Sequence, residues 1–322
     1  DVPTLEFFNG FGGFTPDGEE YVTVMRDGQR TPAPWVNVVA NAGFGFHVSA
    51  DGSSCTWAGN SREHRLTPWS NDPVGDRSGE AIYVRDDDTG LLFGPTALPV
   101  RKASGHYLAR HGRGYSRFEH TRADIALDLL QFVPGDEPVK VSRLRIRNLS
   151  GRTRHLTLTA YVEWVLGTSR SSTAPFVATE IDPVTGGMLA RNLWGGTETR
   201  VAFTDLGGLQ TAWTGNRMEF IGRNGTLERP AALVAGAKLS GRTGAGLDPC
   251  GALQTSVVLA AHSSVELVWL LGEAGTTQAA QAMIARWRGE DMDVALQSVR
   301  ANWSTVLDTA TVRTPDRAFD LM

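Results

Sequence analysis

Two segments in the middle of the chain alternate apolar and polar residues over a length typical of long β-strands. Residues 138–148 read PVKVSRLRIRN, and residues 155–167 read HLTLTAYVEWVLG. Successive side chains of a strand point to opposite faces, so this alternation buries one face of a sheet and leaves the other polar. The residues between them, NLSGR at 148–152, are typical of a turn and predict that the two strands pair with each other.

Short runs rich in Val, Thr, Leu and aromatic residues, bounded by glycine or other turn residues, continue this style through most of the chain. Residues 80–86 (EAIYVRD) and 91–96 (LLFGPT) flank an Asp-Thr-Gly turn and predict a hairpin. Four further strands are predicted in the middle third, at MLARNLW, TRVAFTDL, MEFIGRNG and ALQTSVVLAA. With 36 glycines marking the turns, the pattern predicts a mainly β protein with a large antiparallel β-sandwich over residues 1–272.

Near Glu273 the spacing of the apolar residues changes to that of a helix. Residues 276–289 and 291–308 predict two helices, which we expect to form a linker over residues 273–309. Residues 310–322 contain an extended stretch and then the opening turn of another helix. The residues expected to cap or begin the two linker helices are Thr276, Thr277, Asp291 and Asp293.

Several large apolar side chains lie on one stripe of these predicted helices. We expect Trp287, Trp303 and Phe319 to face away from the sandwich, toward a part of a longer protein. An uncovered apolar patch promotes association. The stripe therefore predicts self-association through these helices.

Composition narrows the class of protein and its partners. The 322 residues carry a net charge of −4 with a pI near 6.0, which gives no overall attraction to nucleic acid. Cys55 and Cys250 lie far apart without metal-ligand spacing, so we expect no disulfide framework and a reducing, cytoplasmic location. No apolar stretch reaches the roughly 18 residues of a membrane-spanning helix.

Residues 56–76, TWAGNSREHRLTPWSNDPVGD, combine aromatic, planar polar and charged side chains without periodicity, and Pro68 and Pro73 exclude a long helix or central strand. We interpret the stretch as a long ordered loop. Indole faces suit sugar rings, and guanidinium, amide and carboxylate groups suit hydroxyl pairs. The alternative is a surface loop braced internally by an Arg65–Asp72 ion pair. The candidate substrate-binding residues are Asn60, Arg62, Arg65, Trp69, Asn71 and Asp72.

The sequence offers no catalytic residue. Asp72, Asp76 and Glu80 lie close together in sequence, but neighbouring carboxylates in a loop usually bind local backbone amides, and no convincing acid/base pair emerges. The histidines lack a recognisable ligand set, so no metal site is predicted.

Several long motifs occur in an order that resembles glycoside hydrolase family 94, formerly glycosyltransferase family 36. They include FFNGFGGFTPDGEEYV, TWAGNSREHRLTPWSNDPVGD, LSGRTGAGLDPC and VRTPDRAFDLM. The chain is most similar to the phosphorylase-like region of cyclic β-1,2-glucan synthases and to β-1,2-oligoglucan phosphorylases. The resemblance implies a galactose-mutarotase-like supersandwich, a helical linker and then an (α/α)6 barrel, of which residues 310–322 would be only the truncated start.

The same resemblance implies inverting phosphorolysis, with inorganic phosphate as co-substrate, no other cofactor, and an acid in the absent barrel. This chain would then be inactive alone and would lend its loop to the acceptor site for a β-glucan oligosaccharide. The implied partners are the barrel of the same protein and a second subunit in a homodimer, on the cytoplasmic side of an inner membrane if the parent is a synthase. Relatives read NSREN where this chain reads NSREH, so a sugar contact at His64 is left open. The alternative function is a self-standing carbohydrate-binding module.

Overall fold

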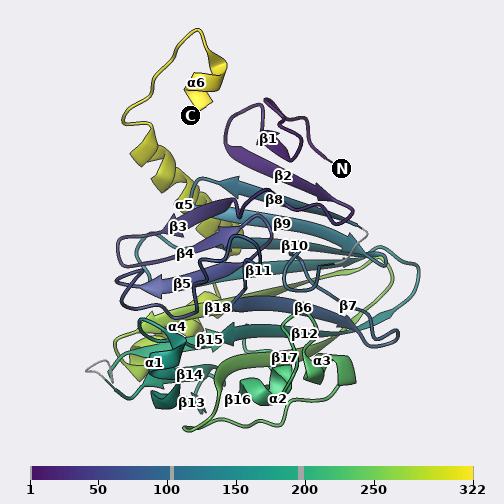
Figure 1. The fold of residues 1–322 in the computed structure, drawn as a ribbon, viewed down its shortest axis with the longest axis vertical. Coiled ribbons are helices and arrows are strands. Elements are labelled where there is room, and N and C mark those ends of the chain that lie inside the picture. Colours follow the sequence, from purple (N-terminus) through teal and green to yellow (C-terminus); the bar gives the residue numbers. More distant parts are fainter. Residues whose placement is uncertain (1, 102–104, 195–198, 322) are drawn as a thin grey trace.

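The strands form two layers of antiparallel sheet, shown in Figure 1 for the computed structural model. The structure describes residues 2–101, 105–194 and 199–321. One layer is a ten-stranded sheet, and the other combines a five-stranded and a three-stranded sheet. The mainly β sandwich predicted from alternation is therefore confirmed.

The ten-stranded sheet has the order β1 (Gly12–Phe14), β2 (Glu20–Arg26), β8 (His106–Gly112), β9 (Tyr115–Arg122), β10 (Ile125–Phe132), β11 (Val139–Asn148), β18 (Ser264–Ala274), β15 (Val201–Asp205), β14 (Met188–Asn192) and β13 (Val177–Ile181). The five-stranded sheet has the order β16 (Ala212–Asn216), β17 (Pro249–Leu259), β12 (Arg154–Glu163), β6 (Glu80–Asp86) and β7 (Leu92–Phe93). The three-stranded sheet is β3 (Val36–Ala40), β4 (Phe44–Ser49) and β5 (Ser54–Ala58).

Short helices lie between some of the strands, and the two longest helices follow the last strand. The helices are α1 (Arg170–Thr173), the 3-10 helix η1 (Ala174–Phe176), α2 (Arg217–Ile221), α3 (Ala231–Ala235), α4 (Thr277–Arg288), α5 (Met292–Leu307) and α6 (Arg317–Leu321). Thr276 and Asp291 cap α4 and α5 through side-chain oxygens that accept backbone N–H groups, as predicted. No helix in the described part of the chain is long and apolar enough to cross a bilayer.

The main apolar core lies between the two layers. Its side chains come from alternate positions of facing strands, for example Phe46 of β4, Leu158 of β12 and Leu144 of β11. A second cluster fills the space between the outer face of the ten-stranded sheet and helices α4 and α5. A third cluster joins the outer face of the five-stranded sheet to α2 and α3.

Trp287 is part of that second cluster, contrary to the expectation that it faces outward. Its side chain is only 2% exposed, packs edge-on against Phe132, and donates from Nε1 to Glu137 Oε2 at 2.5 Å. Trp303 also packs on this cluster, whereas Phe319 remains exposed. The helical stripe was therefore recognised correctly, but its main partner is the sandwich itself.

Two local predictions were wrong. β11 and β12 do not pair, because β11 lies between β10 and β18 while β12 lies between β6 and β17 in the other layer. The chain therefore crosses from one layer to the other between β11 and β12. Asn148 stabilises this crossover, since its side-chain amide donates to the carbonyls of Arg152, Leu259 and Ala260. In the segment MEFIGRNG, predicted as a strand, residues 218–221 belong to helix α2, which Asn216 caps through its side chain.

A buried ion pair joins the two layers. Lys140 of β11 places its Nζ 2.8 Å from Glu80 Oε2 of β6, and both side chains are almost completely buried. Lys140 also donates to Ser54 Oγ at 2.8 Å and lies over the ring of Phe46. Burial opposes the charge of Glu80, but Lys140 and neighbouring hydroxyls outweigh it and lower the pKa of the Glu80 carboxyl. Glu80 is therefore an ionised structural group rather than a catalytic acid.

Lys140→Met should lower the free energy of unfolding by about 3–5 kcal/mol, because it leaves the Glu80 carboxylate buried without a cation. Urea denaturation measures the loss, with Arg147→Met as the control for an exposed cation. The double variant Glu80→Gln/Lys140→Met should recover part of the stability, since neither charge remains. An unchanged midpoint for Lys140→Met would contradict the structural role of the pair.

Candidate functional site

The candidate loop follows β5 and folds back along it. Arg65 forms an isolated β-bridge to Trp57 on one side and to Gly167 on the other, and Leu66 donates its N–H to the carbonyl of Thr56. Leu66 is fully buried in the main core. These contacts anchor the loop beside β5 and Gly167, and the tip of the loop lies at residues 59–63.

The tip is organised by Asn60. Its Oδ1 accepts the backbone N–H groups of Arg62 at 2.8 Å and Glu63 at 3.0 Å, which closes a local turn. The Arg62 side chain is 86% exposed, and its contact with Glu63 at 3.4 Å is at the surface. Asn60 therefore shapes the tip, and Arg62 presents an accessible guanidinium.

Arg65 supports Trp69. The Arg65 guanidinium donates to the carbonyls of Ser61 at 2.9 Å and Thr168 at 3.1 Å, and it lies 5.3 Å from the centre of the Trp69 ring. The Trp69 side chain remains 48% exposed. A cation held over one indole face leaves the other parts of the ring available for an apolar ligand surface.

Asn71 and Asp72 lie in the next turn. Asp72 Oδ1 accepts the N–H groups of Gly75 and Val74, and these two hydrogen bonds lower the pKa of the Asp72 carboxyl. Asn71 is exposed, and its side chain has no hydrogen-bond partner among the described residues. No ion pair joins Arg65 to Asp72 among the residues that the structure describes, so each is held by backbone groups instead.

His64 points inward rather than toward a ligand. Its Nε2 lies 2.5 Å from Glu273 Oε1 at the end of β18, and both side chains are buried. Arg200 adds a second contact to the same carboxylate, at 3.3 Å from Glu273 Oε2. The residue that departs from the NSREN pattern thus anchors the loop to the ten-stranded sheet.

The neighbouring carboxylates do not form an open pair. Glu80 accepts from the hydroxyls of Thr56 and Thr67 in the buried ion-pair cluster, and Asp76 Oδ2 accepts from Ser49 Oγ at 2.6 Å. Burial raises the pKa of the Asp76 carboxyl. Within the described ranges, no group of three or more His, Cys, Asp or Glu side chains is arranged to hold a metal ion.

A pair of exposed aromatic side chains near this loop was missed in the sequence. Phe176 and Trp194 stack with their ring centres 5.1 Å apart and their planes inclined by 22°, and Trp194 is 66% exposed. The segment that carries Phe176 begins at Gly167 and Thr168, which contact Arg65. Trp194 is the last residue of the predicted strand MLARNLW, whereas β14 ends at Asn192. The two glycines that follow Trp194 in sequence were the available signal of a loop position.

The chain is thus a two-layer β domain that presents an anchored loop with an exposed tryptophan and arginines, which are groups suited to sugar rings and their hydroxyls. Residues 19–290 match the family model described as the glycosyl hydrolase 94 supersandwich domain. The chain therefore belongs to glycoside hydrolase family 94, as the resemblance of its motifs indicated.

Relatives in this family include synthases and phosphorylases. The chain is 41% identical to the cyclic beta-(1,2)-glucan synthase NdvB of Rhizobium meliloti (strain 1021) over 323 aligned residues. The alignment covers 100% of this chain and 11% of that protein. The chain is 27% identical over 320 residues to an N,N'-diacetylchitobiose phosphorylase of Vibrio furnissii, covering 97% and 39% of the two chains. A solved structure described as a kojibiose phosphorylase from the human microbiome has a TM-score of 0.51 at 6% identity, covering 94% of this chain and 39% of that one. This chain thus spans 11 to 39% of the length of these relatives.

Arg65→Ala should lower the free energy of unfolding by about 1–2 kcal/mol, because it removes two hydrogen bonds to carbonyls and the support of the Trp69 ring. Arg62→Ala is the matched control, since the Arg62 side chain is exposed and should change stability by less than about 0.5 kcal/mol. Urea denaturation of both variants makes the comparison. Equal stabilities would contradict the supporting role of Arg65.

Proposed function

We propose that this domain serves a β-1,2-glucan-acting phosphorylase or cyclic β-1,2-glucan synthase, and that residues 60–72 are its contribution to the acceptor site. The observation that carries the proposal is the half-exposed Trp69, held in place by Arg65 beside the freely exposed Arg62. The extent of identity to a cyclic β-1,2-glucan synthase supports the choice of glucan.

The loop offers complementary kinds of contact to a glucan. The indole of Trp69 packs on the C–H face of a glucose ring, and Arg62 donates to pairs of hydroxyl oxygens. Asn71 adds an amide that can both donate and accept. Arg65 and Asp72 act mainly by shaping the loop, because their polar atoms already bind backbone groups.

Chemistry takes place elsewhere in the proposed enzyme. The carboxylates near the loop are engaged in the buried cluster, in the contact to Ser49 or in turns. We infer that the acid is supplied by an (α/α)6 barrel of the same protein, with inorganic phosphate as co-substrate and no other cofactor. In a homodimer, the loop would reach either its own or the neighbouring acceptor site, on the cytoplasmic side of the membrane.

The 322-residue chain alone should release no glucose 1-phosphate from β-1,2-glucooligosaccharides in the presence of phosphate. The reason is that its candidate acids are already held by structural contacts. An assay of glucose 1-phosphate on the purified chain measures this, with a family 94 phosphorylase as the positive control. Release of glucose 1-phosphate that increases with the concentration of the purified chain would contradict the proposal that the catalytic acid lies in another part of the enzyme.

Trp69→Ala in the intact enzyme should lower kcat/KM for the acceptor by roughly ten- to a hundredfold, since an aromatic face is lost from the site. The melting temperature should fall by no more than a few degrees, because the half-exposed ring loses its contact with Arg65. Kinetics in the synthetic direction, with acceptor varied, make the measurement. Val74→Ala is the control in the same loop, as Val74 is strongly exposed. Wild-type acceptor kinetics in Trp69→Ala would rule out the proposed contact.

A further inference from the structure

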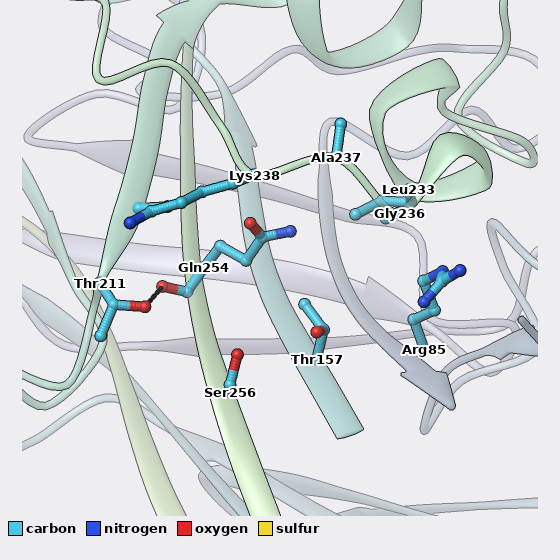
Figure 2. A pocket seen from close by; sticks show the side chains of 10 residues that line it. Arg85, Thr157, Thr211, Leu233, Gly236, Ala237, Lys238, Gln254 and Ser256 are labelled. Atoms are coloured by element: carbon cyan, nitrogen blue, oxygen red, sulfur yellow. Dashed lines mark hydrogen bonds between the residues drawn. The ribbon is translucent and has the colours of Figure 1, made fainter. Parts of the chain in front are cut away.

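A separate cavity of about 250 Å³ lies on the outer face of the five-stranded sheet, beside α3 (Figure 2). At about 30 Å³ per water molecule, it has room for roughly eight waters. In Figure 1, α3 and α1 lie at opposite sides of this end of the domain, so the cavity is distinct from the candidate loop. The polar side chains that line it are Arg85, Thr157, Thr211, Lys238, Gln254 and Ser256.

Arg85 uses only part of its hydrogen-bonding capacity. Its Nη1 donates to Asp87 Oδ1 at 2.6 Å, while its Nε is buried without a partner. The guanidinium lies against Gly236, where an added Cβ would stand 2.8 Å from Arg85 Nη2. Gly236 also has a φ of +64°, which favours glycine, so the backbone can approach this cation closely on one side. The Arg85 side chain is thereby held in position at the cavity.

Gln254 is a buried amide that faces the cavity. The residue is 7% exposed, and Figure 2 shows its amide extending into the space between Lys238 and Gly236. Its Nε2 has one long contact, 3.4 Å to Thr159 Oγ1, and its Oε1 has no partner among the described residues. The amide therefore adds a polar group to the lining of the cavity.

The cavity carries an excess of positive charge. Lys238 is exposed and forms no ion pair with any described residue. The carboxylate nearest Arg85 is Asp87, and both of its oxygens are already used, by Arg85 and by Thr157 Oγ1 at 2.8 Å. The hydroxyl of Ser256 has no hydrogen-bond partner within the described ranges and adds a further donor. Arg85 and Lys238 thus line the same cavity from opposite sides, and each keeps donors that no described residue uses.

We propose that this cavity binds a tetrahedral oxyanion, either inorganic phosphate or the phosphoryl group of a sugar phosphate. Guanidinium and ammonium groups with hydroxyl and amide donors are the groups that bind such anions. No aromatic side chain lines the cavity, so it lacks the stacking surface that a neutral sugar ring would use. The site is independent of the acceptor loop, and either proposal can fail without the other.

Isothermal titration calorimetry on the 322-residue chain tests the proposal with inorganic phosphate, glucose 6-phosphate and glucose. Both phosphates should bind in saturable fashion, and glucose should not. Lys238→Gln should weaken phosphate binding by about tenfold or more, because a charge-assisted contact is lost from an exposed side chain whose removal leaves the fold intact. The matched control is Arg147→Gln, which removes an exposed charge from the other layer and should change the affinity by less than about twofold.

Each result of these titrations has a distinct interpretation. Tighter binding of glucose 6-phosphate than of phosphate would identify a sugar phosphate as the preferred source of the anion, and equal binding would identify the free anion. No saturable binding of either phosphate would overturn the proposal. Equal losses in Lys238→Gln and Arg147→Gln would also overturn it, since the effect would then follow net charge rather than this cavity.

Discussion

The Lys140–Glu80 ion pair is the interaction on which the arrangement of the layers depends. Lys140 comes from the ten-stranded sheet, Glu80 from the five-stranded sheet, and Thr56, which donates to Glu80, from the three-stranded sheet. Removing two charges from water costs several kcal/mol for each ion, on the order of the stability of a domain. The cost is offset only when every oxygen and proton has a partner, so the three sheets must meet in one register. That requirement makes the pair a source of specificity.

The same cluster fixes the base of the candidate loop. Thr56 at its start and Thr67 near its middle both donate to Glu80 Oε1, at 2.6 and 2.7 Å. Between these points, His64 ties the loop to Glu273. The tip at residues 59–63, the Trp69 ring, Asn71 and Val74 are exposed to solvent. A loop ordered before a ligand arrives loses less conformational entropy on binding, which favours affinity from a small number of contacts.

The sequence predicted the class of fold because alternation reports which face of each strand is buried. Alternation does not report the neighbour of a strand, and for that reason β11 and β12 were joined incorrectly. The segment MEFIGRNG was assigned to a strand, although its apolar residues suit either a strand or a helix. The cap at Asn216 favours the helix at its start. Exposure of Trp69 could be predicted from its polar surroundings. The contacts of Arg65 could not, because the acceptor at Thr168 lies about a hundred residues away in sequence.

Helices α4 and α5 pack on the same ten-stranded sheet to which His64 ties the loop. Trp287 of α4 is buried against the ten-stranded sheet, and Arg288 forms hydrogen bonds to Asp205 of β15 at 2.6 and 3.0 Å. Val299 of α5 is buried in the same cluster. These contacts make the two helices part of the packed domain rather than a flexible connection. Since His64 contacts Glu273 of the same sheet, one sheet holds both the loop and these helices. An acceptor site of the proposed kind, assembled between this loop and another part of a longer protein, would need the loop to be held in this way.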